Sequence, residues 1–202
     1  MIPLNKSHAK KQLALFQCDY NRSIEELFAQ TLSENEHIRL FFINENRAFT
    51  DGTNIIVDPG ADMLFADTIA LQNTEARLGL PAVISTDTWY ALRMITRAQN
   101  IHETLHIIYT TFPSPVIADK RSSTTARTKT LALIANIIED AFIEAAGCSV
   151  FDNLELYLGF GRLSRLYANM PSTGTVEQIF SANLPDNKQS IPDTYSPLTR
   201  YL

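Results

Sequence analysis

The sequence predicts an α+β fold that is dominated by helices and contains one small β-sheet. Two observations carry this prediction. Apolar residues recur at helical spacing through two long segments without proline, at about 87–110 and 128–146. Two short runs rich in β-branched and aromatic residues, at 38–43 and 54–57, are typical of strands. We therefore expect a small sheet that packs against the first of the two long helices.

In the N-terminal third, we expect a helix up to about Phe16 and a second one that begins at a capping box. Ser23 is followed three residues later by Glu26, a pair that can bond reciprocally to the first free backbone N–H groups of a helix. The two strand-like runs are separated by Asp51-Gly52, a strong turn signal. They are therefore expected to form a hairpin or two adjacent strands.

Glycine marks the expected ends of two later helices. A helix over residues 61–77 should stop near Gly79, because glycine adopts the left-handed conformation that ends a helix without steric cost. The apolar helix at 128–146 should be closed by Gly147 in the same way. Two further helices are expected at 152–168 and 175–182. Residues 1–184 then form one domain, and the proline-containing polar residues 185–202 form an extended tail or linker.

Charge and composition exclude several classes of function. The chain of 202 residues has 17 Lys and Arg against 22 Asp and Glu, a formal net charge of −5. This balance argues against binding nucleic acid or anionic membranes by bulk charge, which needs a concentrated basic surface. The two cysteines are far apart, and no apolar stretch is long enough to span a bilayer. We expect a cytoplasmic protein without disulfides, and neither nucleic acid nor a membrane as partner.

The first long helix carries an HExxH motif, His102-Glu103-Thr104-Leu105-His106. Residues four apart share a helix face, so both imidazoles can reach one metal ion. Glu103 is then placed to act as general base on a water molecule held by zinc, whose pKa the metal lowers to roughly 7. Two of the 4 histidines of the chain lie in this motif, which makes a chance match a poor explanation. The motif predicts a Zn²⁺ site with His102 and His106 as ligands.

The third protein ligand must come from elsewhere, because no histidine follows closely downstream. The candidates are acids of the second long helix. A 100° projection gathers its apolar side chains into one stripe, with Glu139 at the flank of the stripe and Asp140 nearly opposite. If the stripe faces the core, Glu139 is the better placed ligand, and Asp140 is the alternative. Asp140 or Glu144 would then orient a ligand histidine. The other interpretation is that these acids form a solvated face.

With HExxH on one helix and an acid on a later helix, the chain resembles gluzincin-type zinc metallopeptidases, whose third ligand is a glutamate. The motif with Phe112 behind it, and residues 136–144, are similar to the metallopeptidase-like region of the cobaltochelatase T-subunit family. Residues 48–56 resemble the strand that precedes the motif helix in that family. The resemblance covers residues 45–147 and implies a zincin-like fold and an AAA-type ATPase partner. The von Willebrand A domain of that family, with its DxSxS motif, has no counterpart in this sequence.

These observations lead to one main functional hypothesis and one alternative. The main hypothesis is a zinc-dependent metallopeptidase that hydrolyses a peptide or protein substrate. In zincins an edge strand beside the motif helix binds the extended substrate, and Asn54, Ile55 and Ile56 are the candidates for that strand; the plain alternative is a buried strand. The alternative function is a catalytically silent zincin-fold module that binds metal or a partner ATPase, since fold does not settle function.

Overall fold

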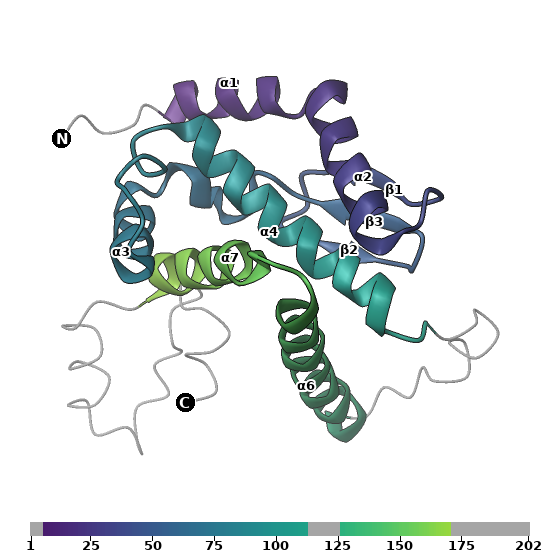
Figure 1. Ribbon diagram of the computed structural model, residues 1–202. Coiled ribbons are helices and arrows are strands. Elements are labelled where there is room, and N and C mark those ends of the chain that lie inside the picture. The colour runs from purple at the N-terminus through teal and green to yellow at the C-terminus, as the bar shows by residue number, and fades with distance from the viewer. Residues whose placement is uncertain (1–5, 113–125, 171–202) are drawn as a thin grey trace, which may run out of the picture.

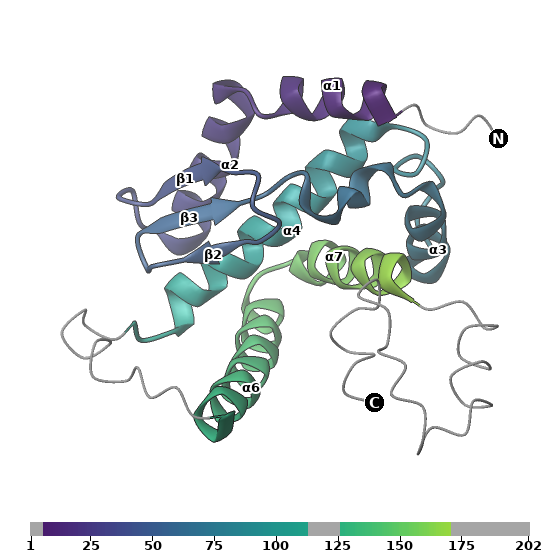
Figure 2. The same cartoon turned by 180° about the vertical axis from the view of Figure 1, so that it is seen from behind.

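The computed structural model describes residues 6–112 and 126–170, and the long helix α4 (Thr88–Tyr109) lies at its centre (Figure 1). The α+β class with dominant helices and one small sheet is confirmed. Seen from both sides, α1 and α2 lie along one flank of α4, the sheet lies beside its C-terminal half, and α6 projects away from the rest (Figures 1 and 2). None of the helices in these residues is long and apolar enough to span a bilayer.

The first two helices are α1 (Lys6–Phe16) and α2 (Asp19–Ser33). The capping-box prediction for Ser23 is wrong, because α2 begins four residues earlier, after Cys18 in an extended conformation. Glu26, which should have closed the capping box, instead accepts a hydrogen bond from the backbone N–H of Leu40 and forms an ion pair with Arg22. Its carboxylate thus ties α2 to the first strand.

The sheet contains three strands in the order β1 (Arg39–Phe42), β3 (Asn54–Val57), β2 (Phe49–Thr50). The prediction of adjacent strands is confirmed, but the hairpin is not the expected one. The two predicted strands, β1 and β3, pair in parallel, and the Asp51-Gly52 turn joins β3 to the short strand β2. In this turn Asp51 Oδ1 accepts hydrogen bonds from the backbone N–H groups of Thr53 and Asn54, and Gly52 has a φ of 97°.

One face of the sheet is covered by helices α2 and α4. Leu40, Ile55 and Val57 point to that face and are fully buried, together with Ala29 of α2. The expected packing of the sheet against the motif helix is therefore present, since α4 contacts both β2 and β3. This packing fixes the position of the C-terminal half of α4, where the HExxH motif lies.

The segment after the sheet divides into a 3₁₀ helix, η1 (Ala61–Ala66), and an α-helix, α3 (Thr68–Leu78). The expected continuous helix over 61–77 is therefore only partly correct. Asp67 starts α3 by accepting a hydrogen bond from the backbone N–H of Ala70. The predicted stop at Gly79 is confirmed, because this residue ends α3 in the left-handed conformation with a φ of 67°.

The motif helix α4 agrees closely with its prediction. Asp87 accepts a hydrogen bond from the backbone N–H of Trp89 and so caps the N-terminus. A buried ion pair joins the middle of α4 to α2: Arg97 donates two hydrogen bonds to the Glu25 carboxylate, with Nε 2.8 Å from Oε2, and Asn100 donates a third. The turn of α4 that precedes the motif is thus held in a fixed position.

The last described helices are α6 (Ala126–Val150) and α7 (Leu154–Asn169). Gly147 does not end α6 as predicted but lies inside it. A Cβ atom at this position would lie 2.5 Å from Leu105 Cδ2, so the glycine is needed where α6 packs against Leu105 of α4. The helix expected at 175–182 and the tail expected at 185–202 lie outside the described residues.

Candidate metal centre

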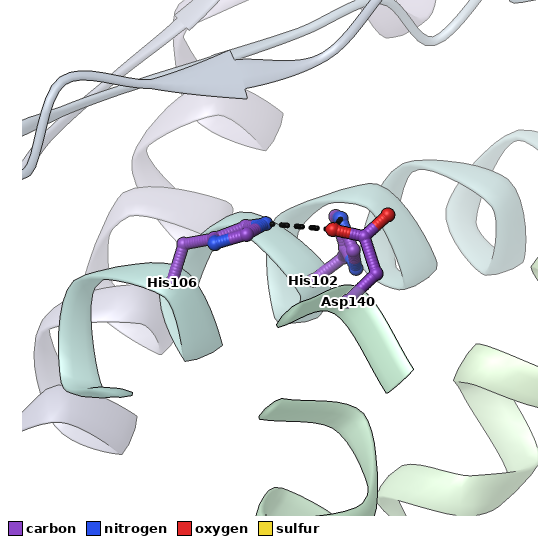
Figure 3. A group of neighbouring side chains, drawn as sticks. All are labelled: His102, His106 and Asp140. Atoms are coloured by element: carbon purple, nitrogen blue, oxygen red, sulfur yellow. Dashed lines mark ion pairs between the residues drawn. The ribbon is translucent and has the colours of Figure 1, made fainter. Parts of the chain in front are cut away.

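The two histidines of the motif lie one turn apart on the face of α4 that meets α6 (Figure 3). The centroids of their rings are 4.9 Å apart and the ring planes are perpendicular. The side chains of His102 and His106 are 20% and 14% exposed, so both are accessible without being solvated all round. The i, i+4 spacing has thus produced the shared face that the sequence predicts.

Helix α6 places Asp140 opposite both histidines. Its Oδ1 atom lies 3.3 Å from His106 Nε2 and 3.8 Å from His102 Nε2 (Figure 3). One ligand atom from each of the three residues lies within 4.8 Å of the others. Zinc–ligand distances of about 2 Å in a tetrahedral arrangement separate two ligand atoms by roughly 3.3 Å, so this donor set fits a metal ion with small adjustments. His102, His106 and Asp140 therefore form a group that could hold a metal ion.

The face of α6 that packs against α4 is opposite to the face that we expected to be buried. The apolar stripe of α6, which consists of Leu131, Ile134, Ile138 and Phe142, is exposed, whereas Ile143 is buried against α4. The inward face carries residues at helical spacing: Asp140, Ile143, Glu144 and Gly147. The close contact of Gly147 with Leu105 decides this orientation, because only the glycine face allows α6 to approach α4. The projection that favoured Glu139 assumed that the most apolar face would be buried.

Glu139, the first candidate for the third ligand, is linked to His106 only through the hydroxyl of Thr110. Its Oε1 atom accepts a hydrogen bond of 2.7 Å from the hydroxyl of Thr110, which in turn lies 2.9 Å from His106 Nδ1. Because the hydroxyl donates its proton to Glu139, it accepts from His106, so Nδ1 of His106 carries a hydrogen. In the neutral form of His106 the lone pair is then on Nε2, the atom that lies 3.3 Å from Asp140 Oδ1.

Glu144 orients the other histidine. Its Oε1 atom lies 2.8 Å from His102 Nδ1 and 2.5 Å from Arg162 Nη2 of α7. Burial alone would raise the pKa of Glu144, but the hydrogen bonds from His102 and Arg162 outweigh it and hold the pKa below its ordinary value. The ionised carboxylate accepts the Nδ1 proton of His102, as the sequence analysis proposed for this residue. Nε2 of His102 is therefore also available to a metal.

Electrostatics favour the neutral form of His106 that binds metal. Burial lowers the pKa of His106 and the neighbouring His102 lowers it further, while Asp140 and Glu139 act in the opposite direction; the net pKa is below its ordinary value. A metal ligand must be deprotonated at the atom that binds. The lowered pKa therefore favours the form of His106 that can bind a cation.

Glu103, the predicted general base, is nearly buried, with 5% of its surface exposed. Burial raises the pKa of Glu103 to about 7; the neighbouring His102 acts against this rise and the Asp140 carboxylate adds to it. A group whose pKa lies near neutrality can both accept and return a proton under physiological conditions. Its environment therefore matches the role that the motif predicts.

The predicted substrate strand requires a correction. Asn54, Ile55 and Ile56 belong to β3, which is the middle strand of the sheet and pairs with β1 on one side and β2 on the other. Ile55 is completely buried. An extended peptide cannot be added to a strand with both edges paired, so the buried-strand alternative is the correct one for these residues.

Two residues of the site escaped the sequence analysis. Thr110 continues the i, i+4 series of the histidines by one further turn, a spacing that would have revealed it. Arg162, which lies 3.9 Å from Asp140 Oδ2 as well as bonding to Glu144, comes from a separate helix without any local signal. Its position depends on how α7 packs.

Comparisons with known proteins identified no relative of this chain. A scan against protein-family models, a search of curated proteins and a search of solved structures each found no match.

Proposed function

We propose that the protein is a zinc-dependent metallopeptidase with a zincin-like arrangement of its site. The observation that supports this most directly is the convergence of three ligand atoms, two of them imidazole nitrogens whose opposite ring nitrogens are already hydrogen-bonded. His102, His106 and Asp140 would hold the zinc ion. Glu139 and Glu144 would hold the two imidazoles in the orientation that binding needs.

The chain's own residues supply the remaining chemistry. A zinc ion here would act as a Lewis acid and lower the pKa of a water molecule to about 7. Glu103 accepts the proton of the attacking water at its carboxylate and later returns a proton to the leaving amine. Burial of Glu103 keeps its pKa close to the pH at which both transfers are needed. Arg162 and Thr110 donate hydrogen bonds to Glu144 and Glu139, the acids behind the histidines, and keep them in place.

The proposed substrate is an extended peptide or an unfolded protein segment. Because β3 is paired on both sides, strand addition would use the outer edge of β2, the edge strand that contacts α4. Main-chain hydrogen bonds to this edge would provide affinity independent of the substrate sequence. This edge replaces residues 54–56 as the proposed binding strand.

Zinc analysis of the purified full-length chain tests the metal site. We expect close to one zinc per chain at neutral pH, and less than about 0.2 in His102→Ala, because a site with one histidine and one acid holds zinc poorly. His37→Ala is the matched control, since His37 is exposed and lies outside the site. Equal zinc contents in all three proteins, at any level, would refute the assignment of His102 as a ligand.

Peptide cleavage tests the proposed base and separates the enzyme from the silent module. Glu103→Gln should retain zinc and lose cleavage of a peptide library that the wild type cuts. Cleavage at the same rate by both proteins would rule out Glu103 as the base. A zinc-loaded wild type that cuts no peptide would instead favour a module that binds metal or a partner ATPase.

A further inference from the structure

The N-terminal half of α6 exposes a large apolar surface. Every residue from Thr130 to Ile138 is exposed, and no charged residue lies among them. The large apolar side chains here and on the next turn are about half exposed or more: Leu131 56%, Leu133 50%, Ile134 47%, Ile137 57%, Ile138 64% and Phe142 63%. A helix that is apolar nearly all round is normally buried, so part of this surface should be covered in the working protein.

The apolar stripe of α6 has the geometry of a helix-pairing seam. Leu131, Ile134, Ile138 and Phe142 are separated by three, four and four residues, which places them along one side of the helix over a length of about 16 Å. At 100° per residue, this side lies opposite Asp140. A partner seated on the stripe therefore leaves the metal-binding side of α6 free.

The position of α6 in the molecule makes the stripe accessible. The helix is anchored to α4 near its C-terminal end, where Ile143 is buried and Gly147 contacts Leu105. Its N-terminal half extends away from the other helices in both views (Figures 1 and 2). Another helix can therefore lie alongside it without meeting α1, α3 or the sheet.

We propose that the stripe is the interface of a homodimer in which the α6 helices of two copies pair antiparallel about a two-fold axis. In such a pair Leu131 of one copy lies beside Phe142 of the other, and the axis passes between Ile134 and Ile138. No charged residue lies between 130 and 138, the centre of the stripe. Pairing two copies about an axis between Ile134 and Ile138 therefore brings no like charges face to face at the centre of the contact, which favours a second copy as the partner.

The exposed area of the stripe and its flanks is small for an interface. The half-exposed side chains of the stripe and its flanks amount to on the order of 500 Å² per copy, or about 1,000 Å² in total, which lies at the lower limit of specific interfaces. Interfaces of this size are typical of weak, reversible association, so we expect dissociation in the micromolar range. The stripe supplies nearly all of the contact, so a single polar substitution at its centre should abolish pairing.

Sedimentation velocity of the full chain between 1 and 200 μM tests the proposal. The wild type should shift from monomer to dimer over this range. Ile138→Glu should raise the Kd by roughly 100-fold or more, since the two-fold axis brings both copies of the substitution into the interface. Ile69→Glu is the matched control, because Ile69 of α3 is 68% exposed and lies away from α6, and this variant should behave as the wild type does.

Two further measurements keep the test decisive. Far-UV circular dichroism must show the wild-type helix content in Ile138→Glu, and Ile134→Asn, which leaves the net charge unchanged, should weaken the dimer as well. A wild type that stays monomeric at 200 μM overturns the proposal, whether the stripe is then covered by residues 171–202 or by another protein. A dimer that neither variant weakens overturns it too.

Discussion

Replacing Glu103 with glutamine should stabilise the metal-free protein, by an amount that grows with pH. In the folded chain, burial raises the pKa of Glu103 from its ordinary value of 4.5 to about 7. The folded protein therefore holds this proton more tightly than the unfolded chain does. The contribution of Glu103 to the free energy of unfolding is lost as pH rises from about 4.5 to about 7. Glutamine has nearly the same size and no charge, so the variant escapes this loss.

The magnitude follows from the pKa rise. At 1.36 kcal/mol for each pKa unit, a rise from 4.5 to about 7 corresponds to roughly 3 kcal/mol once the pH exceeds both values. At pH 5 Glu103 is still mostly protonated in the folded protein, so little of this destabilisation is present. Glu103→Gln should then be more stable than the wild type by at most about 1 kcal/mol. At pH 8 the difference should reach about 3 kcal/mol. Titration of the groups that do not interact with Glu103 is common to both proteins and cancels from the difference.

Urea unfolding in the presence of a chelator, followed by circular dichroism at pH 5 and pH 8, measures this difference. Glu36→Gln removes the same charge from an exposed position and is the matched control. The outcome to exclude is a difference in unfolding free energy between Glu103→Gln and the wild type that changes by less than about 0.5 kcal/mol between the two pH values. Glu103 would then not be in a desolvated environment, and its assignment as the base would be wrong.

Three further predictions concern the third ligand, its support and the packing that presents it. Asp140→Ala should weaken zinc binding by at least about 100-fold and Glu139→Ala by only about 10-fold, as measured by competition with a chromogenic chelator; the reverse order would make Glu139 the ligand. Thr110→Val should weaken zinc binding about 10-fold and Thr110→Ser should restore it, and equal affinities would show that the hydroxyl orients nothing. Gly147→Ala should destabilise the protein by about 1–3 kcal/mol in urea unfolding. Gly159→Ala is the control, because a Cβ atom at this position inside α7 would lie at an ordinary contact distance of 3.7 Å from Leu78 Cδ2, and this variant should be neutral or stabilising. Equal losses of unfolding free energy in both variants would disprove the close contact at Gly147.

Local features of the chain were predictable because they depend on neighbours in sequence. The long motif helix follows from apolar spacing and the Asp87 cap, and Gly79 ends α3 because glycine tolerates the left-handed conformation. The juxtaposition of His102 and His106 follows from the helical period alone. In each case the physical cause acts within a few residues, so the sequence pattern is sufficient to predict the outcome.

The misplaced features depend on contacts between segments that are distant in sequence. Asn54–Ile56 look like an accessible strand, and only the pairing of β3 with both β1 and β2 shows that this strand lies in the middle of the sheet. The apolar stripe of α6 looks like a core face by hydrophobicity, yet four of its large side chains are exposed. Hydrophobicity identifies faces that favour burial, but it does not say which partner is available to bury them.

The sequence by itself therefore determined the two histidines and the glutamate of the motif, because one helical turn brings those residues together. Only the tertiary structure decided which acid faces them. Asp140 lies opposite His102 and His106 because α6 approaches α4 through Gly147, where the missing side chain makes room for Leu105. The fit of two backbones at one glycine, rather than the distribution of apolar residues along α6, sets the composition of the candidate metal centre.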